Sequence, residues 1–210
     1  MMISLIIALA VGTLVVGGNR AWHNSYDSAN SQMETDSIAI TAVFGGIGRR
    51  ANRLNYRLFN LHEGTLTVAE PKFAGSEEVV SGNAVEFKYW DVELDKTDSH
   101  GVMDASKLAT AYALFYVDGD KLKVDYGPYP PGAIPDASKS ARRNTRGVTT
   151  NVLAENVSNV PHSDAGAFSH TTINGVGQGC VRINLVLKDP DTERETRVTT
   201  ATLLRNIWPK

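Results

Sequence analysis

Residues 181–204 read VRINLVLKDPDTERETRVTTATLL, and this stretch decides the fold class expected for the chain. Every second residue from Val181 to Leu187 is apolar, which is the pattern of a strand with one buried face. The DPDTE segment carries turn residues, and the RETRVTTATLL that follows it is rich in the threonine and valine that strands favour. The stretch therefore predicts an antiparallel hairpin near the end of the sequence.

Earlier segments repeat this strand pattern. EGTLTVAEP at 63–71 and AVEFKYWDVEL at 84–94 alternate apolar and polar residues, the second with aromatic weight. ATAYALFYV and KLKVDY flank the turn residues Asp118-Gly119-Asp120, which predicts a second hairpin. Between the two hairpins, GPYPPGAIPDASKSARRNTRG at 127–147 is proline-rich and then basic, and it predicts a long surface loop.

The region before these strands predicts a helix. No proline occurs from 19 to 59, and apolar residues from Ile40 to Leu58 step by three or four. Acids come early and arginines late, as the helix macrodipole favours. Glycines at 45, 46 and 48 predict either a bend or a place where a sheet packs very close to the helix. We therefore expect an amphipathic helix over 19–59, followed by a β-rich domain over 60–210.

The first eighteen residues, MMISLIIALAVGTLVVGG, contain no charged side chain. A secretory signal needs a basic n-region, which this run lacks, and a helix apolar all round needs lipid or similar helices on every side. The run is near the shortest length that spans a bilayer. A membrane anchor over 1–18 is thus favoured over a signal or a buried core helix. Its expected membrane or assembly residues are Met1, Ile3, Leu5, Ile6, Leu9, Val11, Leu14 and Val15.

Composition narrows the chemistry. The 210 residues carry a net charge of -2, so no global charge argues for nucleic acid, and the single cysteine excludes an internal disulfide and a cysteine-rich zinc site. GVGQG at 175–179 lacks the lysine and the context of a phosphate loop. His162, Asp164 and His170 match no zinc spacing. We find no catalytic constellation, and we expect no enzyme activity, cofactor or metal.

A basic run stands out within the expected surface loop. Lys139, Arg142, Arg143 and Arg146 carry four positive charges, with no acid between Asp136 and Glu155. Such runs are usually solvated loops, and the alternative is contact with an acidic partner or with nucleic acid. These four residues are the candidate partner-contact loop.

The chain resembles the type IV pilins and the type II secretion pseudopilins in its arrangement of an apolar N-terminal segment, a helix and a strand-rich domain. MMISLIIALAVGTLVVGG is similar to the start of their mature helix without its first residues. VFGGIGRRANRLNYRL, NAVEFKYWD, VLAENVSNV, VRINLVLKDP and TTATLLRN follow in the order of the corresponding segments of PilW-like minor pilins and J-type minor pseudopilins. The leader and the glutamate of that family would precede Met1.

The resemblance implies an α+β, pilin-like fold, with a long N-terminal helix packed on an antiparallel β-sheet. It also implies a non-catalytic structural subunit of a type IV pilus or a secretion pseudopilus. The expected partners are other pilin or pseudopilin subunits and the inner membrane, where a single-pass anchor would hold the domain outside the cytoplasm before assembly. Two alternatives stay open: a membrane-anchored extracytoplasmic binding domain without a filament, and a secreted β-rich enzyme with a cleaved head.

Overall fold

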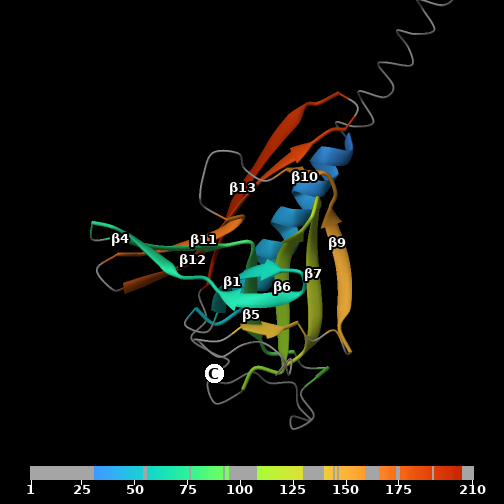
Figure 1. Cartoon of the computed structure of the whole chain (residues 1–210). Coiled ribbons are helices and arrows are strands. Elements are labelled where there is room, and N and C mark those ends of the chain that lie inside the picture. Colours follow the sequence, from blue (N-terminus) through green and yellow to red (C-terminus); the bar gives the residue numbers. More distant parts are fainter. Residues whose placement is uncertain are drawn as a thin grey trace, which may run out of the picture.

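The architecture comes from a computed structural model, shown in Figure 1. It describes residues 31–53, 56–75, 77–91, 93–94, 108–129, 140–143, 145, 147–158, 166–173, 176–190 and 192–204. The expected anchor residues Met1, Ile3, Leu5, Ile6, Leu9, Val11, Leu14 and Val15 lie outside these ranges, as do Lys139 and Arg146 of the basic run.

The expected fold class is wrong. Over the described residues the protein is mostly β, with two antiparallel sheets and a single short helix at 31–50, which we call the core helix. The apolar steps that predicted a helix up to 59 continue past the helix end into a strand, where Leu58 is buried. An apolar residue every third or fourth position cannot by itself separate these two cases over so few residues.

The first sheet has seven strands in the order β8-β2-β1-β5-β6-β7-β9. Its strands are β1 (Tyr56–His62), β2 (Thr65–Val68), β5 (Ala84–Tyr89), β6 (Ala111–Asp118), β7 (Lys121–Pro128), β8 (Ser140–Arg142) and β9 (Thr149–Ala154). The hairpin predicted around Asp118-Gly119-Asp120 is confirmed as β6 and β7, and Gly119 supplies the positive φ of 63° at the turn. The expected surface loop at 127–147 instead includes β8, which pairs with β2.

The second sheet has six strands. They are β3 (Pro71–Ala74), β4 (Glu77–Gly82), β10 (Val157–Ser158), β11 (Phe168–Ile173), β12 (Val176–Lys188) and β13 (Glu195–Leu203). The order is β10-β12-β11-β4-β3, and β13 pairs with β12. The hairpin predicted over 181–204 is confirmed, with Ile183 opposite Thr200 and the alternate residues Val181 to Leu187 buried.

The core helix joins the two sheets. Its buried stripe includes Ile40 and Phe44, and the ring of Phe44 lies 5.5 Å from Phe87, 5.3 Å from Phe115 and 6.1 Å from Phe168. Phe87 and Phe115 belong to the seven-stranded sheet, and Phe168 belongs to the six-stranded sheet. Figure 1 shows the helix in blue, enclosed by strands of both sheets. The Phe44 side chain thus packs against both sheets and joins them with the core helix in one hydrophobic core.

One helix glycine is required by this packing. A Cβ at Gly48 would collide with the side chain of Thr202 on β13, so only glycine allows the helix to approach that strand. Around Gly45 and Gly46 there is open space. The predicted close approach of a sheet is therefore confirmed at Gly48.

The expected inner-membrane location is also corrected. Within the described ranges, no helix has the length and the apolar character needed to cross a membrane. The core helix carries polar and charged residues along its exposed side, such as Glu34 and Arg49.

Candidate partner-binding surfaces

The described half of the basic run splits between two environments. Arg142 is exposed on β8, at one edge of the seven-stranded sheet. Arg143, the next residue, turns inward over the sheet face that points away from the core helix, which we call the outer face. The sequence alone does not distinguish the two arginines, because neighbouring charges in a loop give no sign of which one points inward.

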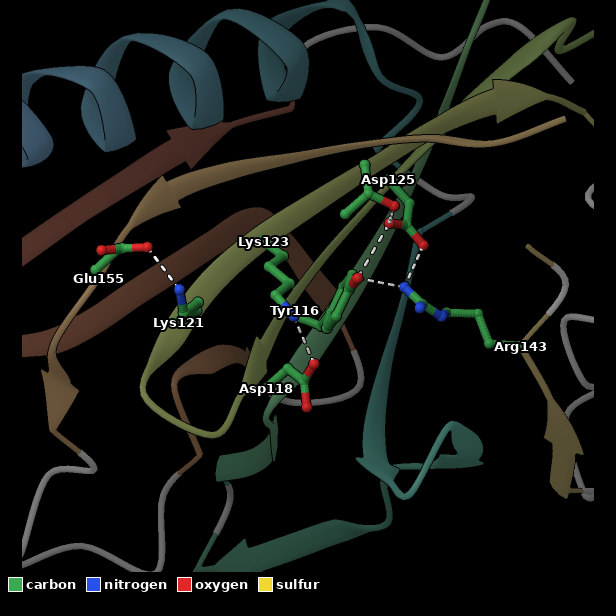
Figure 2. A network of polar contacts seen from close by, with 8 residues as sticks. Tyr116, Asp118, Lys121, Lys123, Asp125, Arg143 and Glu155 are labelled. Carbon is green, nitrogen blue, oxygen red and sulfur yellow. Dashed lines mark hydrogen bonds and ion pairs between the residues drawn. The ribbon is translucent and has the colours of Figure 1, made fainter. Parts of the chain in front are cut away.

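Arg143 is the centre of a buried polar network (Figure 2). Its Nη1 donates to Asp125 Oδ2 at 2.5 Å and also to the hydroxyl of Tyr116. The Tyr116 hydroxyl donates to Asp125 Oδ1 at 3.1 Å, and Thr150 Oγ1 donates to the same oxygen at 2.6 Å. The side chain of Asp125 is 0% exposed and that of Arg143 is 19% exposed. Arg143 therefore holds the segment after β8 against β7 on the outer face.

Protonation favours this arrangement. Burial, with the nearby Asp125 carboxylate, raises the pKa of Tyr116 to about 12, so its hydroxyl stays a donor at neutral pH. Burial alone would lower the pKa of Arg143, but Asp125 and Tyr116 together raise it. The guanidinium also lies over the Tyr116 ring, 4.6 Å from its centre. The arginine is thus a permanent cation held by structural partners.

A second buried carboxylate lies in the same row of the outer face. The strand registers align Arg57, Glu86, Leu114, Asp125 and Thr150 across five strands. Glu86 is fully buried, and within the described part of the chain neither of its carboxylate oxygens has a hydrogen-bond partner. Lys88 Nζ lies 3.6 Å from Glu86 Oε1, too far for a hydrogen bond.

Ionisation of Glu86 is unfavourable at this buried position. Burial raises the pKa of Glu86, although the charges of Lys88 and Arg57 act to lower it. The Lys88 ammonium also lies over the ring of Tyr129, 4.7 Å from its centre. Nothing in the residue alternation of β5 separates a buried Glu86 from an ordinary solvent-facing glutamate, so sequence reasoning missed this feature.

A groove opens between the start of the core helix and the β9–β10 connection. It has a volume of about 320 Å³ and is lined by Gln32, Asp36, Val152, Leu153, Ala154, Glu155 and Asn156. Gln32 Nε2 donates to Asp36 Oδ1 at 2.7 Å, and Lys121 Nζ lies 2.6 Å from Glu155 Oε1. Burial raises the pKa of Asp36; its hydrogen bonds oppose this, and the charge of Glu155 adds to it. We call this the acidic groove.

The opposite end of the core helix is basic. Arg49, Arg50 and Arg53 are all exposed there. Arg49 Nε donates to the carbonyl of Gly45 at 3.1 Å, and the Arg50 guanidinium lies 5.0 Å from the centre of the Tyr89 ring. We call these three residues the arginine end. The sequence indicated this end through its late arginines, but only as a match to the helix dipole.

A polar contact joins the two sheets. The Tyr56 hydroxyl on β1 lies 2.8 Å from His170 Nδ1 on β11. Burial raises the pKa of Tyr56 to about 12, so we assign the hydroxyl as donor and Nδ1 as acceptor. Burial lowers the pKa of His170, against the charge of Glu78. The histidine considered as a metal ligand in the sequence therefore has a structural partner.

The described residues contain no group of three metal-ligating side chains, and His162 and Asp164 lie outside them. Cys180 is a free cysteine of intermediate exposure. Large apolar side chains are exposed at two places that matter below. Phe73 on β3 is 75% exposed, and Ile38 on the core helix is 69% exposed.

No protein-family model, no curated protein and no solved structure matches the chain.

Proposed function

We propose that the protein is a non-catalytic structural subunit of a filament of the type IV pilus or secretion pseudopilus kind. The observation that carries the proposal is the outer side of the core helix. The helix is fixed in the core on one side, and on the other it exposes Ile38 and Ala42, with the half-buried Gly45 three residues further on.

This arrangement suits a subunit that packs against neighbours through its helix. Phe44 packs against both sheets, so a force applied to the helix would be transmitted to them. Ile38 offers an apolar side chain for such a contact, and the small Ala42 beside it would allow another backbone to come close. The order of pilin-like segments in the sequence supports the same proposal.

A binding domain that forms no filament is the second candidate. Phe73 favours it, because this aromatic side chain is 75% exposed on β3, which pairs only with β4 among the described strands. A strand edge of this kind can accept an extended segment of another protein, with Phe73 filling an apolar pocket of the partner.

Filament isolation tests the proposal. Filaments sheared from the surface of producing cells are probed for this chain, beside the variants Ile38→Asp and, as a matched surface control, Glu195→Lys. We expect the wild type and the control in the filament fraction, and loss of Ile38→Asp from it at equal cellular abundance. Absence of the wild-type chain from the filaments, or full retention of Ile38→Asp, would contradict the proposal.

A further inference from the structure

Lys88 lies between two different partners on the outer face. It follows Glu86 by two residues on β5, so the two side chains point to the same face of the sheet. Lys88 Nζ lies 3.6 Å from Glu86 Oε1 and 4.7 Å from the centre of the Tyr129 ring. The Lys88 side chain is only 9% exposed, so the two contacts compete inside the protein rather than in water.

The two contacts depend on protonation in different ways. An aromatic ring attracts a cation through its quadrupole, whether or not a neighbouring carboxyl group is ionised. The contact with Glu86 is strong only when Glu86 carries its charge, because a neutral carboxyl group attracts an ammonium far less than a carboxylate does. Glu86 is fully buried, and neither of its oxygens accepts a hydrogen bond from the described residues. The protonation of Glu86 therefore determines which of its two partners attracts Lys88 more strongly.

The other charged and titratable groups that face Glu86 keep their state near neutral pH. Arg57 lies opposite Glu86 on β1 and is a permanent cation. Asp125, in the same row on β7, is paired with Arg143. Burial raises the pKa of Tyr112 on β6 to about 12, so this phenol stays neutral. Burial also raises the pKa of Glu86, which moves its ionisation from the ordinary 4.5 toward neutral pH.

Tyr129 lies where the chain leaves the seven-stranded sheet. It comes directly after the last residue of β7, and its backbone N–H donates to the carbonyl of Thr110 at 2.8 Å. Its ring packs against the apolar cluster of the outer face. The contact with the Lys88 ammonium therefore helps to hold the end of β7 against this face.

We propose that Lys88 is a pH-sensitive switch, which couples the ionisation of Glu86 to the packing of Tyr129. When Glu86 is neutral, the ammonium stays over the Tyr129 ring. When the pH rises and Glu86 releases its proton to solvent, the carboxylate attracts the ammonium, and the ring loses its cation. This inference goes beyond the proposed function, because it concerns the outer face of the sheet and not the exposed side of the core helix.

The switch acts on one part of the outer face only. Arg143 stays paired with Asp125 on both sides of the transition, because the guanidinium is a permanent cation. A rise in pH therefore loosens the end of β7 at Tyr129, while the segment after β8 keeps its position.

An NMR titration tests the switch on the full chain in a mild nonionic detergent, which shields the apolar residues 1–18. The glutamate carboxyl carbons and the tyrosine rings are isotope-labelled, and the signals are assigned with Glu86→Gln and Tyr129→Phe. We expect the Glu86 and Tyr129 signals to shift between about pH 4 and 9 with one common midpoint, higher than the ordinary glutamate value.

Two variants separate this coupling from a direct effect of the Glu86 charge on the ring. Glu86→Gln cannot ionise, so the Tyr129 signals should no longer shift. In Lys88→Met, Glu86 should still titrate, with a higher midpoint because a nearby cation is lost, but Tyr129 should no longer follow it. Glu195→Gln, at the exposed start of β13, is the matched control and should titrate like the wild type. Circular dichroism verifies that each variant is folded.

A Glu86 signal that does not shift in this pH range would overturn the proposal. So would Tyr129 signals that stay constant while Glu86 titrates, or a Tyr129 shift that persists in either Glu86→Gln or Lys88→Met. The filament test uses Ile38 on the core helix, which takes no part in the switch, so either proposal can fail while the other stands.

Discussion

The two faces of the seven-stranded sheet are built from alternate residues of the same strands, yet they follow different rules. The inner face, with Val85 and Phe87 on β5, buries an apolar cluster that packs on the core helix. The outer face also buries its side chains, including Tyr112 and Leu114, but it encloses the carboxylates of Glu86 and Asp125. The apolar face determines how the chain folds. The charged face instead favours one position of the segment after β8, because only that position pairs Arg143 with Asp125.

The inner face should give the largest loss of stability. Phe44→Ala removes the ring that touches Phe87, Phe115 and Phe168, and we expect the free energy of unfolding to fall by about 3 to 5 kcal/mol. Chemical denaturation measures it. Ile38→Ala, on the exposed side of the same helix, is the matched control and should change stability by less than about 0.5 kcal/mol. Similar losses from both variants would show that the helix is not held as described.

The outer face should respond to charge rather than to volume. Arg143→Met leaves the buried Asp125 without its cation, and we expect a loss of about 3 kcal/mol. Adding Asp125→Asn removes the uncompensated charge while keeping an oxygen for Thr150, so the double variant should regain part of that loss. Arg142→Met, one residue earlier and exposed, should be nearly neutral. A double variant that is no more stable than Arg143→Met would contradict the ion-pair interpretation.

Glu86 should give the outer face an unusual pH dependence. Its pKa is raised above the ordinary 4.5 by burial, so its contribution to stability is complete below that pH. It is lost as the pH rises through the folded-state pKa, because the carboxylate then ionises without hydrogen bonds. We expect Glu86→Gln to remove this loss, on the order of 2 kcal/mol, from unfolding curves taken between about pH 4 and 8. An unchanged pH profile in Glu86→Gln would contradict the account.

The contact between the sheets should show the opposite and smaller dependence. The pKa of His170 is lowered from 6.5, so its stabilising effect is present above about pH 6.5 and is lost as the pH falls through the folded-state pKa. Protonated Nδ1 can no longer accept from the Tyr56 hydroxyl. We expect a loss of about 1 kcal/mol on acidification, which is absent in His170→Gln and reduced in Tyr56→Phe, where burial of the imidazole still lowers its pKa. Proton NMR titration of His170 checks the direction of the shift independently.

The difference between the two faces of the seven-stranded sheet also explains which features could be predicted from the sequence. Alternation located the strand from 181 to 187 and the hairpin at Gly119, because each buries one regular set of apolar residues. It could not place Leu58 in β1, because an apolar residue three or four steps beyond a helix stripe fits either element. Regularity along one element says little about which elements meet, so the second sheet was missed.

The charged features were hidden for a related reason. Glu86 and Asp125 are buried on the outer face, and the aligned row they belong to exists only after five strands have paired. The acidic groove likewise combines Asp36 of the helix with Glu155, more than a hundred residues later. The basic run was visible in the sequence, but only the fold separates the half-buried Arg143 from the exposed Arg142.

The central functional claim is that the exposed side of the core helix faces neighbouring subunits. The most direct measurement places a photo-crosslinkable residue at position 38 in one strain and at position 73 in another, and identifies the captured proteins by mass spectrometry of producing cells. The account predicts that position 38 captures filament subunits. Capture from position 73 alone, with none from position 38, would contradict it and favour a binding domain that uses the edge of β3.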